Sequence, residues 1–186
     1  DLGSLSPVSK AMMAMDSSLR ADLAAGDART LVVVQGANLQ ATLEATESVA
    51  RTLDALQERG VIGGYDSVTR WLPSLATQKA RQAALPDTAT LQSALAEATR
   101  DGPLRAARLA PFVADVQSAR RLAPIELPAL RAAGLNTIVD ALLVQRADGS
   151  VASLLPLQPV QGQPTPADGA TGDSSLVQQA LAARND

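Results

Sequence analysis

The sequence predicts an α+β fold: a sheet of about four strands with a large, purely helical insertion. Three observations lead to this prediction. A β-branched run, an amphipathic stretch and a second short apolar run follow one another over residues 30–66, which is the order of a β-α-β unit. Residues 67–134 carry no strand signal and are divided by Pro and Gly. Two apolar runs joined by Asp-Gly over residues 138–157 then predict a β-hairpin.

Local signals define the β-α-β unit. Residues 31–34 predict a short strand, Asn38 is expected to cap the following helix, and Gly60 is expected to end it. Residues 61–65 predict the second strand, reached by a right-handed crossover. The apolar stripe of the helix is expected to contain Leu39, Leu43, Val49, Leu53 and Leu56. The solvated side is expected to contain Glu44, Glu47, Arg51, Asp54 and Glu58.

The remaining elements follow from capping residues and turn residues. The insertion is expected to contain helices over 75–84, 87–99, 111–122 and 127–133, with Asp87 as the N-cap of the second. Strands are expected over 138–146 and 151–157, and an amphipathic helix over 7–25 precedes the β-α-β unit. The resulting order is a split β-α-β pattern, which is compatible with a four-stranded ferredoxin-like sheet.

The domain organisation is predicted from composition. We expect one α/β domain over residues 1–160, a flexible Gly/Pro-rich linker over 161–173 and a C-terminal helix over 174–186. The chain begins at Asp1 without an initiator Met, and both ends are expected to be cuts from a longer polypeptide.

Composition excludes several classes of function. The chain has no His and no Cys, so imidazole bases, thiol nucleophiles and zinc sites with nitrogen or sulfur ligands are excluded. The net charge is −3 with no basic cluster, which argues against a nucleic-acid partner. The acidic residues fall where helix caps and solvated faces are expected. We therefore expect no enzymatic activity, no metal and no cofactor.

The single tryptophan is the most informative side chain. Trp71 lies just after the second predicted strand, at the start of the helical insertion. One interpretation is a core anchor; the other is the wall of an apolar cleft between sheet and insertion. The sequence leaves both open.

Five groups of residues, taken in order, carry a resemblance to a known family. They are residues 1–8; 31–36; 63–67 with 71–74; 76–78 with 81–82; and 109–112 with 115–116. Together they resemble an extracytoplasmic loop domain of the MMPL-type predicted exporters, in the resistance-nodulation-division (RND) transporter superfamily. The resemblance covers residues 1–157 and is greater to the second large loop, between the seventh and eighth membrane helices.

This resemblance implies a function. It predicts a porter-like periplasmic domain of a bacterial inner-membrane, proton-driven exporter of lipids or lipid-like molecules such as pigment esters. Its partners would be the transmembrane helices and the other periplasmic loop of the same polypeptide, a lipophilic small-molecule cargo, and further copies in a homo-oligomer. The energy-coupling residues would lie outside this segment. The alternative is a structural domain that mediates contacts between protomers or with a partner protein.

The cargo path is expected at an apolar cleft. It would be bordered by Trp71 and Leu72 and by Leu109, Phe112 and Val116 of the insertion. Long-chain amphiphiles are expected to bind there weakly, because a transport domain must release what it captures.

Overall fold

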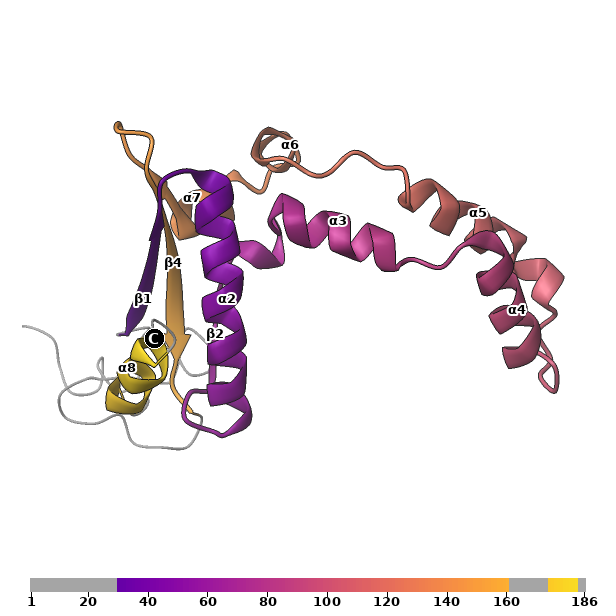
Figure 1. Ribbon diagram of the computed structural model, residues 1–186, viewed down its shortest axis with the longest axis horizontal. Coiled ribbons are helices and arrows are strands. Elements are labelled where there is room, and N and C mark those ends of the chain that lie inside the picture. Colours follow the sequence, from indigo (N-terminus) through magenta and orange to yellow (C-terminus); the bar gives the residue numbers. More distant parts are fainter. Residues whose placement is uncertain (1–29, 161–173, 184–186) are drawn as a thin grey trace, which may run out of the picture. The chain divides into compact units, whose positions relative to one another are not determined.

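The computed structural model describes residues 30–160 and 174–183. It has the predicted α+β class, with a four-stranded antiparallel sheet and helices (Figure 1). The helix predicted over 7–25 and the linker predicted over 161–173 lie outside the described residues. The last described element is α8 (Ser174–Ala182), in which Val177 is buried.

The chain divides into two compact units, and each is described by itself. The described residues of the first unit are 30–33, 49–67, 154–160 and 174–183. The second unit comprises 34–48 and 68–153, and therefore contains most of the helical insertion. Three elements, β1, α2 and β4, contribute residues to both.

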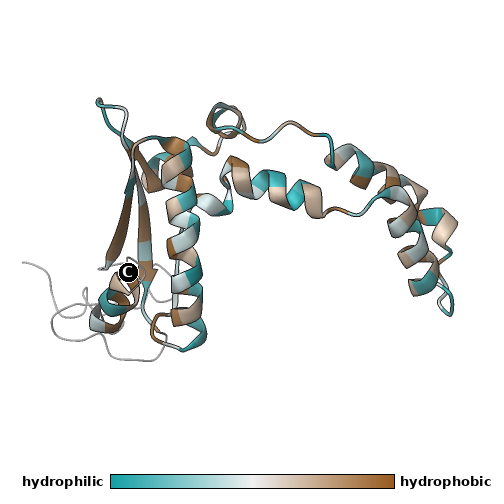
Figure 2. Ribbon diagram, viewed as in Figure 1, coloured by the Kyte–Doolittle hydropathy of each residue, from teal (hydrophilic) through white to brown (hydrophobic). Residues whose placement is uncertain are grey.

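The sheet is organised around its longest strand, β4 (Val151–Gln158). The strand order is β1-β4-β2, so β4 separates β1 (Leu31–Gly36) from β2 (Gly64–Tyr65) and the β-α-β unit is split. The short β3 (Leu143–Gln145) pairs with the start of β4. Figure 2 shows hydrophobic residues concentrated along β1 and β4. The predicted strands 31–34 and 151–157 are therefore confirmed.

The helix of the β-α-β unit, α2 (Leu39–Glu58), begins and ends at the predicted residues. The side chain of Asn38 accepts a hydrogen bond from the N–H of Ala41 at 3.0 Å, which is the predicted N-cap. Gly60 has φ 70°, the left-handed conformation that commonly ends helices. The buried stripe contains Leu43, Val49, Leu53 and Leu56.

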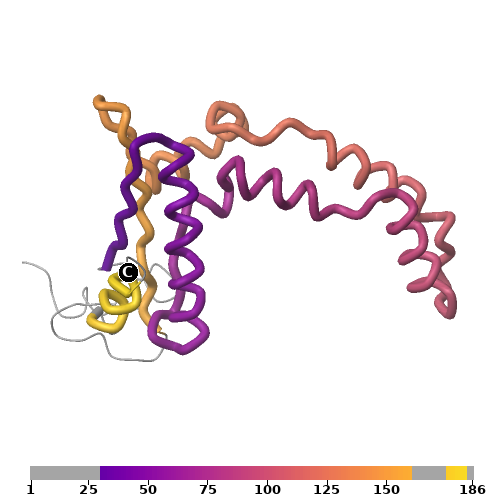
Figure 3. Tube along the Cα trace, viewed as in Figure 1, coloured from indigo at the N-terminus to yellow at the C-terminus, as the bar shows by residue number. Residues whose placement is uncertain are grey.

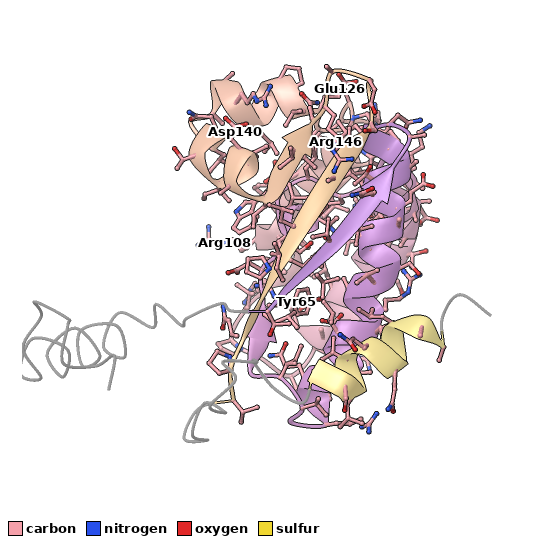
Figure 4. The ribbon with its side chains drawn as sticks, turned by 90° about the vertical axis from the view of Figure 1, so that its left-hand side faces the viewer. Tyr65, Arg108, Glu126, Asp140 and Arg146 are labelled. Atoms are coloured by element: carbon pink, nitrogen blue, oxygen red, sulfur yellow. The ribbon has the colours of Figure 1, made fainter. Side chains whose placement is uncertain are left out.

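The second strand is shorter than predicted. Residues 61–65 were expected to pair, but β2 contains Gly64 and Tyr65 alone. The N–H of Val61 instead donates to the carbonyl oxygen of Leu56 at 3.0 Å, completing the C-terminal turn of α2. Ile62 is buried as a core residue outside the sheet. Tyr65, labelled in Figure 4, anchors β2 against α2, because its hydroxyl donates to Asp54 Oδ1 at 2.6 Å.

Every element between Val68 and Ala132 is helical, as the sequence predicts for the insertion. The elements are η2 (Val68–Arg70), α3 (Leu75–Ala84), α4 (Thr88–Ala98), η3 (Ala106–Leu109), α5 (Ala110–Ala119) and α6 (Leu127–Ala132). The side chain of Asp87 accepts from the N–H of Thr90 at 2.8 Å, so this predicted cap is also confirmed. Figure 3 follows the trace through these helices and back to the sheet.

The strand predicted over 138–146 is wrong for most of its length. Asn136–Leu142 form helix α7, and the strand β3 begins at Leu143. Val139, Leu142 and Leu143 are buried, whereas Ile138 and Val144 are exposed. This spacing of three and four residues is that of a helix with one buried face, and a short apolar run does not distinguish it from a buried strand. The Asp-Gly turn that follows is confirmed, with Gly149 at φ 85°.

The second unit has a contiguous aliphatic core. It joins α2, η2, α6, α7, β3 and β4 through Leu43, Val68, Leu72, Leu127, Leu130, Val139, Leu142, Leu143 and Val151. Leu39, Trp71 and Leu135 pack against this cluster and are partly buried. The core therefore anchors the insertion where its two ends meet the sheet.

Candidate functional site

The predicted site residues fall into two groups. Leu72 is 2% exposed within the core cluster, and Trp71 packs against the same cluster. Leu109 lies in η3, whereas Phe112 and Val116 lie in α5. The core-anchor interpretation of Trp71 therefore agrees with its packing, and the cleft bordered by all five residues stays a prediction.

A cavity of about 230 Å³ lies between α4 and the continuous helical segment of η3 and α5. Small side chains create it, because α4 meets alanines at positions where larger residues would fill the space. Its lining consists of Gln92, Leu95, Ala106, Ala107, Ala110 and Val113. Of this lining, Ala110 and Val113 belong to the segment 109–116 of the predicted cleft, and none of the five residues named for that cleft is among the lining residues.

The chemistry of this cavity is that of apolar binding. No charged side chain lines it, and the only polar side chain in its lining is Gln92. The cavity is partly open to solvent, with Gln92, Ala107 and Ala110 exposed. Its volume exceeds the roughly 150 Å³ of an enclosed apolar cavity that binds benzene, so it has room for a short alkyl chain or one ring. Sequence reasoning missed it, although Ala107, Ala110 and Val113 recur every three residues and so share one face of the helical segment.

A second polar arrangement connects the insertion to α2. The carboxylate of Glu47 accepts three hydrogen bonds: from Ser74 N at 2.7 Å, Ser74 Oγ at 2.8 Å and Thr77 Oγ1 at 2.6 Å. Gln40 Oε1 accepts from Leu75 N at 2.9 Å. These bonds satisfy N–H groups at the start of α3, where a negative charge also interacts favourably with the helix dipole. Glu47 was predicted to lie on the solvated side of its helix. Its hydrogen bonds instead connect α2 to the start of the insertion.

The outgoing and returning parts of the insertion are tied by side-chain amides. Gln78 Nε2 donates to the carbonyl oxygen of Ile125 at 2.9 Å, and Gln78 Oε1 accepts from Ile125 N at 2.7 Å. Gln82 Nε2 donates to the carbonyl oxygen of Leu122 at 2.8 Å. Helix α3 itself has no buried residue. Polar bonds rather than apolar packing therefore keep the returning chain beside α3.

Hydrogen bonding also changes the acidity of one cap. Hydrogen bonds from the backbone and then the side chain of Thr90 lower the pKa of the exposed Asp87 carboxyl, against a small opposing effect of desolvation. This is the behaviour of an N-cap carboxylate and needs no catalytic role.

Within residues 30–160 and 174–183, no three acidic side chains gather where they could hold a metal ion. In the same part of the chain, no helix is both long and apolar enough to cross a membrane. The expectations of no enzymatic activity and no cofactor stay predictions. Comparison of the chain with family models, curated proteins and solved structures finds no match.

Proposed function

We propose that the chain is a porter-like periplasmic domain of an MMPL-type exporter of the RND superfamily, and that it forms or gates the path of lipid-like cargo. The observation that carries this proposal is the strand order β1-β4-β2, a split β-α-β arrangement with a helical insertion between β2 and β3. A ferredoxin-like module outside the membrane is what the sequence resemblance implies.

The insertion supplies the surface for the cargo in this proposal. Its cavity is apolar and small, so it would hold one end of a lipid-like molecule while the rest contacts other parts of the exporter. Leu109 and Val116 are partly buried beside it, and Phe112 is 49% exposed. Weak, reversible capture follows from this limited burial, because affinity depends on the apolar surface removed from water.

Placement is tested first, by cysteine labelling. Residues 1–186 contain no Cys, so Ser93→Cys on the exposed surface of α4 introduces the single thiol of this segment, and the full-length protein without the substitution is the labelling control. A membrane-impermeant maleimide should label this thiol in cells whose outer membrane alone has been permeabilised. Labelling that requires lysis of the inner membrane would show that the periplasmic placement is wrong.

Cargo handling is tested next, with two matched substitutions in α5. Ala110→Leu fills the cavity, whereas Ala114→Leu places the same side chain at an exposed position that does not line it. The readout is the surface level of the lipid species that a deletion strain fails to export. Ala110→Leu should reduce this level and Ala114→Leu should not; equal levels in both variants would argue against the cavity as part of the path.

The exposed apolar residues of the returning chain favour a second function, contact with protomers or a partner protein. Leu122 is 64% exposed and Ile125 is 50% exposed, although both are large hydrophobic residues. Under this alternative, Leu122→Ser with Ile125→Ser should lower the oligomeric state of the full-length protein in sedimentation, and Ala110→Leu should leave export unchanged.

A further inference from the structure

Two Asp-Gly pairs lie in exposed connections of the second unit. Asp101 and Gly102 lie between α4 and η3, and both residues are exposed. Asp148 and Gly149 lie in the exposed turn between β3 and β4. In an Asp-Gly pair the side-chain carboxyl reacts readily with the next backbone nitrogen, because glycine has no side chain to obstruct the approach. The two pairs contain the same reactive groups, so their surroundings decide which pair reacts.

The carboxylate of Asp148 is engaged by the residue that follows Gly149. Asp148 Oδ1 accepts hydrogen bonds from Ser150 N at 2.9 Å and from Ser150 Oγ at 2.6 Å. These hydrogen bonds, first that of the side chain and then that of the backbone, lower the pKa of the Asp148 carboxyl. The protonated carboxyl, which is the form that can lose its hydroxyl group as water, is therefore less populated at this position.

The carboxylate of Asp101 has no such partner. In the described part of the chain, no hydrogen bond or ion pair involves its side chain. The backbone nitrogens do not separate the two sites, because each donates to the carbonyl oxygen three residues earlier, at 3.3 Å for Gly102 and 3.1 Å for Gly149. The carboxyl group of Asp101 can therefore turn toward the nitrogen of Gly102, whereas that of Asp148 must first break its hydrogen bonds.

We propose that Asp101 is a site of isoaspartate formation and that hydrogen bonding protects Asp148 from the same reaction. The backbone nitrogen of Gly102 attacks Cγ of Asp101. The N–Cγ bond forms as the bond from Cγ to the hydroxyl group breaks, and the amide proton leaves with that hydroxyl group as water. Water then opens the resulting succinimide ring. Opening at Cγ restores aspartate, and opening at the backbone carbonyl carbon leaves isoaspartate.

This modification would change the connection between the two walls of the apolar cavity. Helix α4 provides Gln92 and Leu95, and η3 with α5 provide the remaining lining residues. In isoaspartate the main chain runs through Cβ and Cγ, so the connection becomes longer by one methylene group while the net charge stays the same. The reaction needs no reagent other than water. The inference rests on the surroundings of the two carboxylates and does not depend on the export function.

Peptide mapping of the full-length protein after incubation in mildly acidic buffer tests the proposal. An endoprotease that cleaves before aspartate but not before isoaspartate reports each position separately by mass spectrometry. That includes Asp168, which also precedes a glycine and lies outside the described residues. Cleavage should be lost at Asp101 at least about tenfold faster than at Asp148, because a hydrogen bond to a charged group contributes about that factor or more. In guanidinium chloride, which removes the folded geometry, the two rates should become similar.

Three substitutions relate the rates to the structure. Ser150→Ala removes the hydroxyl that bonds to Asp148 and should speed the reaction there severalfold, with no change at Asp101. Ser93→Ala, the matched control at an exposed position of α4, should change neither rate. Gly102→Ala should slow the reaction at Asp101 severalfold, because a methyl group obstructs the attack. The nearest atom to that methyl group lies 4.0 Å away, so circular dichroism should show unchanged helix content.

Three results would overturn the proposal. One is a rate at Asp148 that equals or exceeds the rate at Asp101 in the folded protein. Another is full cleavage at Asp101 in the folded protein while the denatured protein reacts, which would show that folding protects both sites. The third is an unchanged rate at Asp148 in Ser150→Ala, because hydrogen bonding would then not separate the two sites.

Discussion

Removal of the Glu47 carboxylate should loosen the attachment of the insertion to α2. In Glu47→Ala the three hydrogen bonds to Ser74 and Thr77 are lost together. Each hydrogen bond to a charged group contributes about 1.5–3 kcal/mol, and the contributions are not additive. Ser74 is fully buried, so its N–H and hydroxyl lose their acceptor without access to water. The half-buried Thr77 can partly recover by hydration. We expect a decrease of about 3 kcal/mol in the free energy of unfolding.

Urea denaturation followed by far-ultraviolet circular dichroism measures this change, with Glu44→Ala as the matched control. Glu44 lies in the same helix, is exposed, and has no partner among the described residues, so its removal should change the free energy of unfolding by less than about 0.5 kcal/mol. Hydrogen exchange adds a local readout, because the N–H groups of Ser74 and Leu75 should lose protection in Glu47→Ala alone.

The reasoning would be refuted by equal destabilisation in the two variants. A double-mutant cycle sharpens the result: Glu47→Ala and Thr77→Val should be coupled by at least about 0.5 kcal/mol, because the two side chains share a 2.6 Å hydrogen bond. Additive effects would mean that this bond contributes nothing to stability.

Three further predictions concern single positions. Ser153 has a fully buried hydroxyl oxygen without a hydrogen-bond partner among the described residues, so Ser153→Ala should raise the free energy of unfolding by about 1 kcal/mol and with it the urea midpoint. A lower midpoint would show that the hydroxyl has a hydrogen-bond partner in solution. Gly36→Ala should lower the free energy of unfolding by more than about 1 kcal/mol, because the added Cβ would lie 2.6 Å from the hydroxyl oxygen of Thr42 in α2. Gly60 has φ 70° but open space around it, so Gly60→Ala should lower the free energy of unfolding by about 1 kcal/mol or less. A larger loss in Gly60→Ala than in Gly36→Ala would contradict the packing at Gly36. The pKa of Asp87 is lowered in the folded state, so its contribution to stability is present at pH values above the pKa of the unfolded state and is lost as pH falls through the pKa of the folded state. Nuclear magnetic resonance titration of the folded protein should give a pKa below 3.8. The free energy of unfolding of Asp87→Asn should fall less on acidification than that of the parent protein.

Local sequence signals determined much of the secondary structure. Asn38 and Gly60 set the ends of α2, Asp87 set the start of α4, and the Asp-Gly turn set the last hairpin, because each residue acts through its own backbone conformation or through a hydrogen bond a few residues away. The same local rules failed over 138–146, where a short apolar run fits a helix as well as a strand and burial against the core of the second unit favours the helix.

The residues that make up the candidate site became apparent only in the tertiary structure. Glu47 is hydrogen-bonded to Ser74, 27 residues away, and Gln78 to Ile125, 47 residues away, so neither contact can be deduced from helix periodicity. The cavity depends on which faces of α4 and α5 meet, and Trp71 is partly buried where it packs against the core cluster of the second unit. The sequence by itself determined both ends of α2, the start of α4 and the last turn, where capping and turn residues act locally. The pairing of distant surfaces required the folded chain, because it depends on the shape and burial of both partners at once.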